Sequence, residues 1–249
     1  MRQKQRFGIL WGETGMKAVD ISLKRRLFPN INEDGWKFVS ILALISIVLT
    51  MLWIPLGCIS FFITIWSFYC FRDPMRITPI LSDVIVAPAD GLIISINRVK
   101  GPDSLGLGNK NYTRLCIYSS LFDSQINRMP LKGKVSKIFY DAGKPFSGAL
   151  DKNALNNERL LIALRNGNQE FVVQQTATIC SKRIISKAEM GEEFLAGQRF
   201  GHIRYGGYVD LFLPDKIEPQ VCMGQQMTAG ETIIAYIRSD APRIEGEIR

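Results

Sequence analysis

Residues 199–214 read RFGHIRYGGYVDLFLP, and the paired glycines at their centre, Gly206 and Gly207, decide how this stretch folds. Two adjacent residues without side chains favour a bend. The apolar residues that follow are typical of a strand that becomes buried. The stretch therefore predicts a glycine bend that leads into a core strand. It also raises the question of whether the bend only turns the chain or marks a chemical site.

Composition narrows the class of protein. The chain has 249 residues, of which 47% are hydrophobic and 22% charged, which is enough for one core with an appendage. A formal charge of +8 indicates anionic partners, either nucleic acid or acidic lipid. The five cysteines are scattered and form no CxxC pair, which favours a reducing compartment. His202 is the only histidine, so no metal site is predicted and a metallopeptidase is not expected.

An uncharged apolar segment precedes most of the chain. Residues 38–71 contain no Asp, Glu, Lys or Arg, a run long enough to cross a bilayer. Pro55 and Gly57 lie near its middle, so it predicts one kinked span, a pair of thin spans or a re-entrant helical hairpin. We therefore expect a basic N-terminal segment at 1–37, a helical membrane anchor at 38–71 and one domain at 72–249.

The charges before this anchor indicate its orientation. Residues 1–37 hold eight basic and four acidic side chains, and such an excess favours the cytoplasmic side of a membrane. A hairpin would return the following domain to the same side, whereas a single span would export it. The reduced cysteines favour the hairpin. The expected location is the inner (cytoplasmic) membrane, with the domain facing the cytoplasm.

Beyond residue 72 the pattern becomes short β-rich runs separated by Gly, Pro and Asn. Strands are predicted within 83–99, 113–122, 133–140, 170–186, 208–214 and 231–237. Residues 154–166 are ambiguous. The predicted fold is mainly β, a β-rich α+β hybrid of sandwich and barrel. Basic and acidic residues are interspersed without an aromatic stacking platform, so nucleic-acid binding is not expected.

Seven blocks of this domain resemble one protein family in their order along the chain. They are FRDPMRITP (from Phe71), VIVAPADGLI (from Val84), LFDSQINRMPLKGKV (from Leu121), GALDKNALNNERLLI (from Gly148), VVQQTATICSKRI (from Val172), RFGHIRYGGYVDLFLP (from Arg199) and GQQMTAGETIIA (from Gly224). The chain thereby resembles the phosphatidylserine decarboxylases, specifically the short bacterial type with an N-terminal hydrophobic anchor.

The resemblance implies a particular chemistry. Members of this family are precursors that break their own Gly-Ser bond, and the serine becomes an N-terminal pyruvoyl group. That carbonyl forms a Schiff base with the amine of phosphatidylserine and accepts electrons as carbon dioxide leaves. Hydrolysis then releases phosphatidylethanolamine. The expected cofactor of the family is therefore made from the chain itself.

The sequence departs from the family pattern at two catalytic positions. The cleavage block, approximately RFGS in the family, reads RYGG here, so Gly206 and Gly207 match the cleavage site and Gly207 takes the serine position. Glycine has neither the hydroxyl nor the β-carbon from which a pyruvoyl group arises, so no cofactor is expected. Gln125 stands where the family block DVHVNRAP has its histidine, and an amide does not titrate near neutral pH. Asp90, in APADG, matches the family aspartate that orients the histidine.

No other residue is expected to restore these functions. His202 lies five residues before Gly207, which on one extended strand places it about 16 Å away and on the opposite face. Ser186 and Ser239 lie too far along the chain to replace the missing serine. Gly207→Ser alone is predicted not to restore processing, because Gln125 cannot take the hydroxyl proton.

The family's polar pocket residues are retained, and the resemblance implies that they bind an amino-phospholipid head group. They are Asp151, Lys152, Asn157, Glu158, Arg159 and Arg204. On pattern alone they would be surface ion pairs, worth about 0–1 kcal/mol each.

Two hypotheses follow for the function. The first is an uncut, non-catalytic relative that binds the lipid of an anionic membrane or a partner, such as an active paralogue or a second copy of itself. The second is a genuine pyruvoyl-dependent decarboxylase whose sequence carries inactivating changes.

Overall fold

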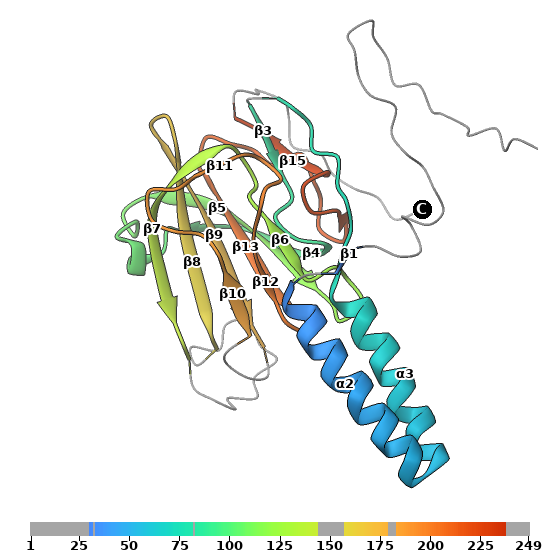
Figure 1. Cartoon of the computed structure of the whole chain (residues 1–249). Helices are drawn as coiled ribbons and strands as arrows, with labels where there is room; N and C mark the ends of the chain where they lie inside the picture. The colour runs from blue at the N-terminus through green and yellow to red at the C-terminus, as the bar shows by residue number, and fades with distance from the viewer. Residues whose placement is uncertain (1–29, 32, 82, 144–156, 179–182, 238–249) are drawn as a thin grey trace, which may run out of the picture.

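The computed structural model describes residues 30–31, 33–81, 83–143, 157–178 and 183–237, and shows a β domain from which two helices project (Figure 1). The helices are α2 (Glu33–Leu52), α3 (Ile54–Cys70) and the short 3-10 helix η1 (Asp103–Leu105). The strands are β1 (Asn30–Ile31), β2 (Arg72–Asp73), β3 (Val84–Val86), β4 (Gly91–Lys100), β5 (Asn111–Ser119), β6 (Ile126–Arg128), β7 (Gly133–Asp141), β8 (Arg159–Asn166), β9 (Gln169–Ala177), β10 (Ile184–Ser186), β11 (Glu193–Phe194), β12 (Arg199–Ile203), β13 (Gly207–Pro214), β14 (Gln226–Met227) and β15 (Ile233–Tyr236).

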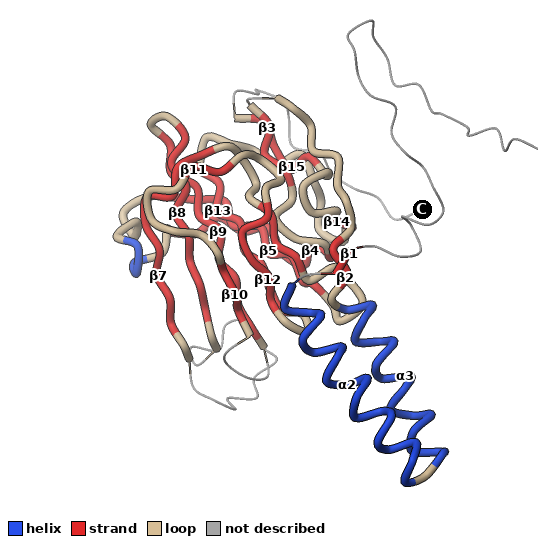
Figure 2. The backbone as a smooth tube through the Cα atoms, in the orientation of Figure 1, coloured by secondary structure: helices blue, strands red, loops and turns tan. Residues whose placement is uncertain are grey.

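The uncharged segment forms a helical hairpin. α2 and α3 run antiparallel and join at Trp53, with Pro55 in the first turn of α3, where a missing N–H does no harm (Figure 2). The helices approach closely at Gly57, where a β-carbon would overlap the Thr50 hydroxyl, and such small-residue contacts are typical of helix pairs in membranes. Within the described residues, one helical stretch, Gly35–Leu52, is long and apolar enough to cross a bilayer, and α3 is shorter.

The β domain is built on one large antiparallel sheet. Its eight strands follow the order β11-β7-β8-β9-β13-β5-β4-β14, so β13 lies in the middle between β9 and β5. A three-stranded sheet, β10-β12-β6, and the pair β15-β3 lie over one face of this curled sheet (Figure 1). β12, in the three-stranded sheet, directly precedes β13 in the chain. The short connection between them therefore links the two sheets.

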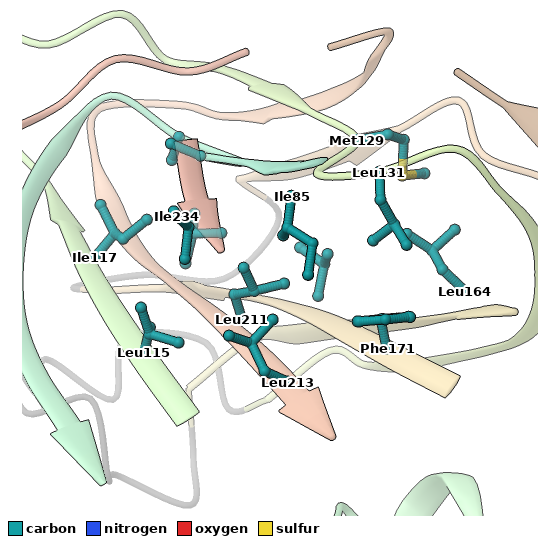
Figure 3. Close-up of a cluster of buried hydrophobic side chains, with 14 of the residues drawn as sticks. Ile85, Leu115, Ile117, Met129, Leu131, Leu164, Phe171, Leu211, Leu213 and Ile234 are labelled. Carbon is teal, nitrogen blue, oxygen red and sulfur yellow. The ribbon is translucent and has the colours of Figure 1, made fainter. Parts of the chain in front are cut away.

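The main core fills the space between these layers. Leu115, Leu211 and Phe171 point into it from the large sheet, and Ile85 and Ile234 from the β15-β3 pair (Figure 3). Because side chains alternate along a strand, every second residue points to the other face. A smaller cluster there packs under the loop that contains η1, and it comprises Leu105, Leu107, Tyr112, Leu161, Ala163, Val172 and Phe212. The mainly β, sandwich-like prediction is confirmed.

Each of the six apolar runs predicted as strands contains one, but two of them are divided. Residues 83–99 split into β3 and β4 around Pro88, which lacks an N–H for the ladder, and Gly91, which has a φ of +144°. Residues 170–186 split into β9 and β10. The ambiguous stretch 154–166 contains strand β8.

Candidate functional site

The paired glycines lie at the bend between β12 and β13. β12 ends at Ile203 and β13 begins at Gly207, and between them Tyr205 and Gly206 have φ values of +62° and +80°. Two features favour glycine at position 206. Its φ is positive, and a β-carbon there would lie 2.6 Å from the Ser119 carbonyl oxygen. Tyr205 has the only positive φ of a non-glycine residue in the described part of the chain. The bend is therefore a strained backbone feature that its surroundings hold in place.

Gln125 holds one side of the bend. Its Oε1 accepts a hydrogen bond from the Gly206 N–H at 2.5 Å, and its Nε2 donates to the carbonyl oxygens of Ser120 and Asp123, both at 2.9 Å. The side chain is 3% exposed. The structure therefore brings together two positions that the sequence resemblance links, Gln125 and the Gly206–Gly207 pair, although they are about 80 residues apart in the chain.

Arg183 holds the other side of the bend. This buried side chain donates from Nη2 to the Gly206 carbonyl oxygen at 2.9 Å and from Nε to the Arg204 carbonyl oxygen at 2.7 Å. Its Nη1 donates to the Thr178 carbonyl oxygen. All three guanidinium nitrogens are thus used on backbone carbonyls. Sequence reasoning missed Arg183 as a site residue; its only signal was a basic residue next to an apolar strand, inside the block that begins at Val172.

Glu158 supports Arg183 from behind. Its Oε2 accepts the Arg183 backbone N–H at 2.7 Å, and its Oε1 accepts the Tyr140 hydroxyl at 2.8 Å. Burial and this hydrogen bond raise the pKa of Tyr140 to about 12. Glu158 and the neighbouring Asn157 are both buried. These two predicted pocket residues therefore lie inside the protein, with Glu158 connected to the bend through Arg183.

Asp90 has partners other than Gln125. Its Oδ2 lies 2.5 Å from Arg76 Nη2, and its Oδ1 accepts the Ala229 backbone N–H at 2.7 Å. Burial raises the pKa of Asp90, and the Arg76 guanidinium opposes that rise. The nearby Asp123 carboxylate, two residues from Gln125, adds to the rise in the pKa of Asp90. Asp90 therefore lies near Asp123, in the loop that carries Gln125, but it is paired with Arg76.

Of the other predicted pocket residues, the structure describes Arg204 and Arg159, and the two have different partners. Arg204 contributes its backbone carbonyl to Arg183, while its guanidinium carbon lies 4.8 Å from the centre of the Phe38 ring. Arg159 pairs with Asp141 at 2.8 Å. Asp151 and Lys152 lie outside the described residues. A shared head-group pocket made of all six residues stays a prediction.

His202 and Gly207 do not lie on one extended strand, so the predicted separation of about 16 Å does not apply. A turn separates the two residues, because β12 ends at Ile203 and β13 starts at Gly207. The Ile203 side chain would contact a β-carbon at position 207 at 3.2 Å. Since neighbouring residues of a strand point to opposite faces, His202 is directed away from the face that Ile203 shares with Gly207. His202 itself is buried in β12, paired with Ile126.

A serine near Gly207 in space was also missed. Ser119 lies directly opposite Gly207 in the β13–β5 ladder, a neighbour that separation along the chain does not reveal. A hydroxyl on β5 still cannot become the first residue of a new chain that starts at 207. Ser119 therefore offers no source for an N-terminal pyruvoyl group.

The bend also contacts the helical hairpin. The Phe71 ring stacks on Phe38 with centroids 5.7 Å apart and meets the Tyr205 ring edge-on at 5.9 Å. Nearby, Arg72 Nη2 donates to the Phe122 carbonyl oxygen at 2.7 Å. The base of the hairpin thus packs against both the bend and the loop that carries Gln125.

Comparisons with known proteins identify the family of this arrangement. The family model for phosphatidylserine decarboxylase matches residues 63–235. The phosphatidylserine decarboxylase proenzyme of Cereibacter sphaeroides is 40% identical over 220 residues, covering 88% of this chain and 95% of the relative. The proenzyme of Beijerinckia indica is 38% identical over 222 residues, covering 89% of this chain and 95% of the relative. No solved structure matches.

The chain belongs to the phosphatidylserine decarboxylase family. The family uses a self-derived pyruvoyl group, and the residues of this chain do not fit one. Gly207 has no side chain, and a β-carbon built there would lie 2.5 Å from the Thr176 carbonyl oxygen. In the part of the chain that the structure describes, no three His, Cys, Asp or Glu side chains are grouped to hold a metal ion.

Proposed function

We propose that this phosphatidylserine decarboxylase family protein remains uncut and catalytically inactive, and that it binds an amino-phospholipid head group or a protein partner at the membrane. The observation that carries the proposal is Gly207, where the resemblance places the serine that becomes the pyruvoyl group. Without a β-carbon at this position, the chain has no atoms from which to make the electron sink of the reaction.

The surroundings of the bend support natural adaptation over a decarboxylase with two inactivating changes. Gln125 accepts one hydrogen bond and donates two, and an imidazole ring has only two nitrogens with which to replace them. The Thr176 carbonyl occupies the space that a side chain at position 207 would need. Both positions are thus built around the residues that they now hold.

The hairpin supports a place at the membrane. Its outward side chains are large and apolar, for example Leu44 and Phe62, which are 66% and 69% exposed. Because the hairpin brings the chain back to its starting side, the basic N-terminal segment and the β domain would share the cytoplasmic side. Tyr205 packs on Phe71 at the base of the hairpin, so the bend would lie near the depth of lipid head groups. An active paralogue or a second copy of the chain stays an expected protein partner.

Intact-mass analysis of the purified full chain tests the central claim. We expect one species of about 28.1 kDa, and no release of carbon dioxide from phosphatidylserine vesicles. A fragment that begins at residue 207 with a pyruvoyl terminus would contradict the proposal, as would lipid-dependent carbon dioxide release.

Two variants separate the proposal from its alternative. Gly207→Ser should remain uncut, because Gln125 cannot take the hydroxyl proton. Gln125→His combined with Gly207→Ser should also remain uncut, because the Thr176 carbonyl crowds a side chain at 207. Self-cleavage of the double variant would favour the decarboxylase with two inactivating changes. Cleavage of the single variant would show that this chain needs no histidine for processing.

Head-group binding has its own test. Glycerophosphoserine, titrated into the detergent-solubilised chain, should bind saturably and more tightly than glycerophosphocholine. Equal binding of the two compounds would remove the amino-phospholipid from the proposal and leave the protein partner.

A further inference from the structure

A second polar region lies on the opposite face of the large sheet. A cavity of about 360 Å³ opens there between the sheet and the turn at residues 102–104. Its apolar wall includes Phe139, Leu161 and Phe212, and its cationic groups are Lys100, Arg114 and Arg159. The turn and η1 pack beside β7, on the side of the β domain away from α2 and α3 (Figure 2).

Arg114 is an unusual residue for its position in the sheet. It lies on the inner strand β5, and its cross-strand neighbours are Asn97 and Phe212, neither of which carries a negative charge. Its Nε is buried and has no hydrogen-bond partner within the described residues. A buried donor without an acceptor costs free energy, which an oxygen atom of a ligand would recover.

Arg159 brings a second donor to the same cavity. One of its terminal nitrogens, Nη2, pairs with Asp141 at 2.8 Å, but its Nε is also buried without a partner in the part of the chain described. Among the residues that line the cavity, Asp103 is the one acid against three cations, and Asp141 pairs with Arg159 beside them, which leaves an excess of one positive charge. The cavity is therefore electropositive, and guanidinium groups bind carboxylate and phosphate oxygens in paired geometry.

The size and the walls of the cavity restrict the ligand further. Its volume lies at the small end of the range for small-molecule sites. The rings of Phe139 and Phe212 and the Leu161 side chain offer contact to hydrocarbon next to the cations. A molecule with one anionic group and a short apolar part matches both surfaces.

We propose that this cavity binds a small organic phosphate or carboxylate, with its anionic group between Arg114 and Arg159 and its apolar part against Phe212. The site is separate from the bend, because Phe212 and Gly207 lie on opposite faces of β13. Because the turn that borders the cavity lies on the side of the β domain away from α2 and α3, we expect a soluble ligand.

Calorimetric titration of the full chain in detergent tests the site with phenyl phosphate as the probe. We expect saturable binding that is about tenfold tighter than binding of inorganic phosphate, because the ring adds apolar contact. Arg114→Gln should weaken phenyl phosphate binding at least about tenfold, because a charge-assisted hydrogen bond is lost. Arg98→Gln is the matched control: this exposed arginine on β4 pairs with Glu218 outside the cavity, and its loss should leave binding unchanged.

Equal binding by wild type and Arg114→Gln would overturn the site, as would the absence of saturable binding. If Arg114→Gln does not fold, Lys100→Gln at the exposed rim should still weaken phenyl phosphate binding severalfold, and no effect there would count against the site. Vesicles that contain phosphatidic acid should not compete with phenyl phosphate. Competition would keep the anion site but assign it to a lipid head group in place of a soluble ligand.

Discussion

The bend and the cavity on the opposite face of the large sheet each have an arginine with buried donor groups. Only the arginine at the bend has all three of its guanidinium nitrogens hydrogen-bonded to the protein. Arg183 donates from all three guanidinium nitrogens to backbone carbonyls at and near the bend. Arg114 leaves its buried Nε without an acceptor in the described chain. A cation whose donors are satisfied internally holds structure, whereas one with an unused donor beside a cavity is suited to a ligand.

The same substitution at both arginines tests this difference with the largest expected effect. Arg183→Met should lower the free energy of unfolding by about 3–5 kcal/mol, because it leaves several buried carbonyls unsatisfied. Arg114→Met should change it by less than about 1 kcal/mol, because it removes a donor that has no partner. Denaturant titration of both variants in the same detergent measures the difference. Equal losses in the free energy of unfolding would mean that the two arginines contribute equally to stability.

Two glycines with positive φ, Gly206 in the bend and Gly167 in a surface turn, test how tightly the backbone of the bend is held. Gly206→Ala should cost about 2–4 kcal/mol, because φ is +80° and the new methyl group would press on the Ser119 carbonyl. Gly167, in the turn between β8 and β9, has a φ of +56° and open space around it, so Gly167→Ala should cost only about 1 kcal/mol. Thermal unfolding followed by circular dichroism compares the two. A Gly206 variant as stable as the Gly167 variant would show that the bend is not tightly held.

The smallest effect on stability is expected at Tyr140, which reaches the bend only through Glu158 and Arg183. Tyr140→Phe should cost about 1 kcal/mol at pH 8, because Glu158 loses one hydrogen bond. The folded-state pKa of Tyr140 is raised from 10.0 to about 12, so its contribution is present below pH 10 and is lost as the pH rises towards 12. The stability gap between wild type and Tyr140→Phe should therefore narrow between pH 8 and pH 11. A gap that stays constant would mean that the Tyr140 hydroxyl does not depend on Glu158.

Local pattern and family resemblance predicted the β domain and the apolar segment, and the resemblance assigned both Gln125 and Gly207 to catalytic positions. Strand periodicity and turn residues are local properties, so Val84–Val86 and Gly207–Pro214 could be read directly from the sequence. Arg183 could not be predicted, because its three carbonyl partners come from the end of β9 and from the bend. The cavity around Arg114 depends in the same way on which strands become neighbours.

The position of His202 relative to Gly207 could not be predicted from their separation in the sequence. The distance expected from strand rise holds only if residues 202–207 are extended. The positive φ values of Tyr205 and Gly206 turn the chain instead. Residues with positive φ reverse direction within two positions, so a distance estimated from strand rise fails there. The same turn brings the Ile203 side chain to 3.2 Å from a β-carbon built at position 207.

If the chain stays uncut at Gly206 and Gly207, as we propose, its refolding involves only one molecule. β12 and β13 belong to different sheets, yet one peptide connects them, so neither can diffuse away while the other is unfolded. Renaturation should then proceed at a rate independent of protein concentration, whereas a relative cut at this point would have to reunite two separate polypeptides.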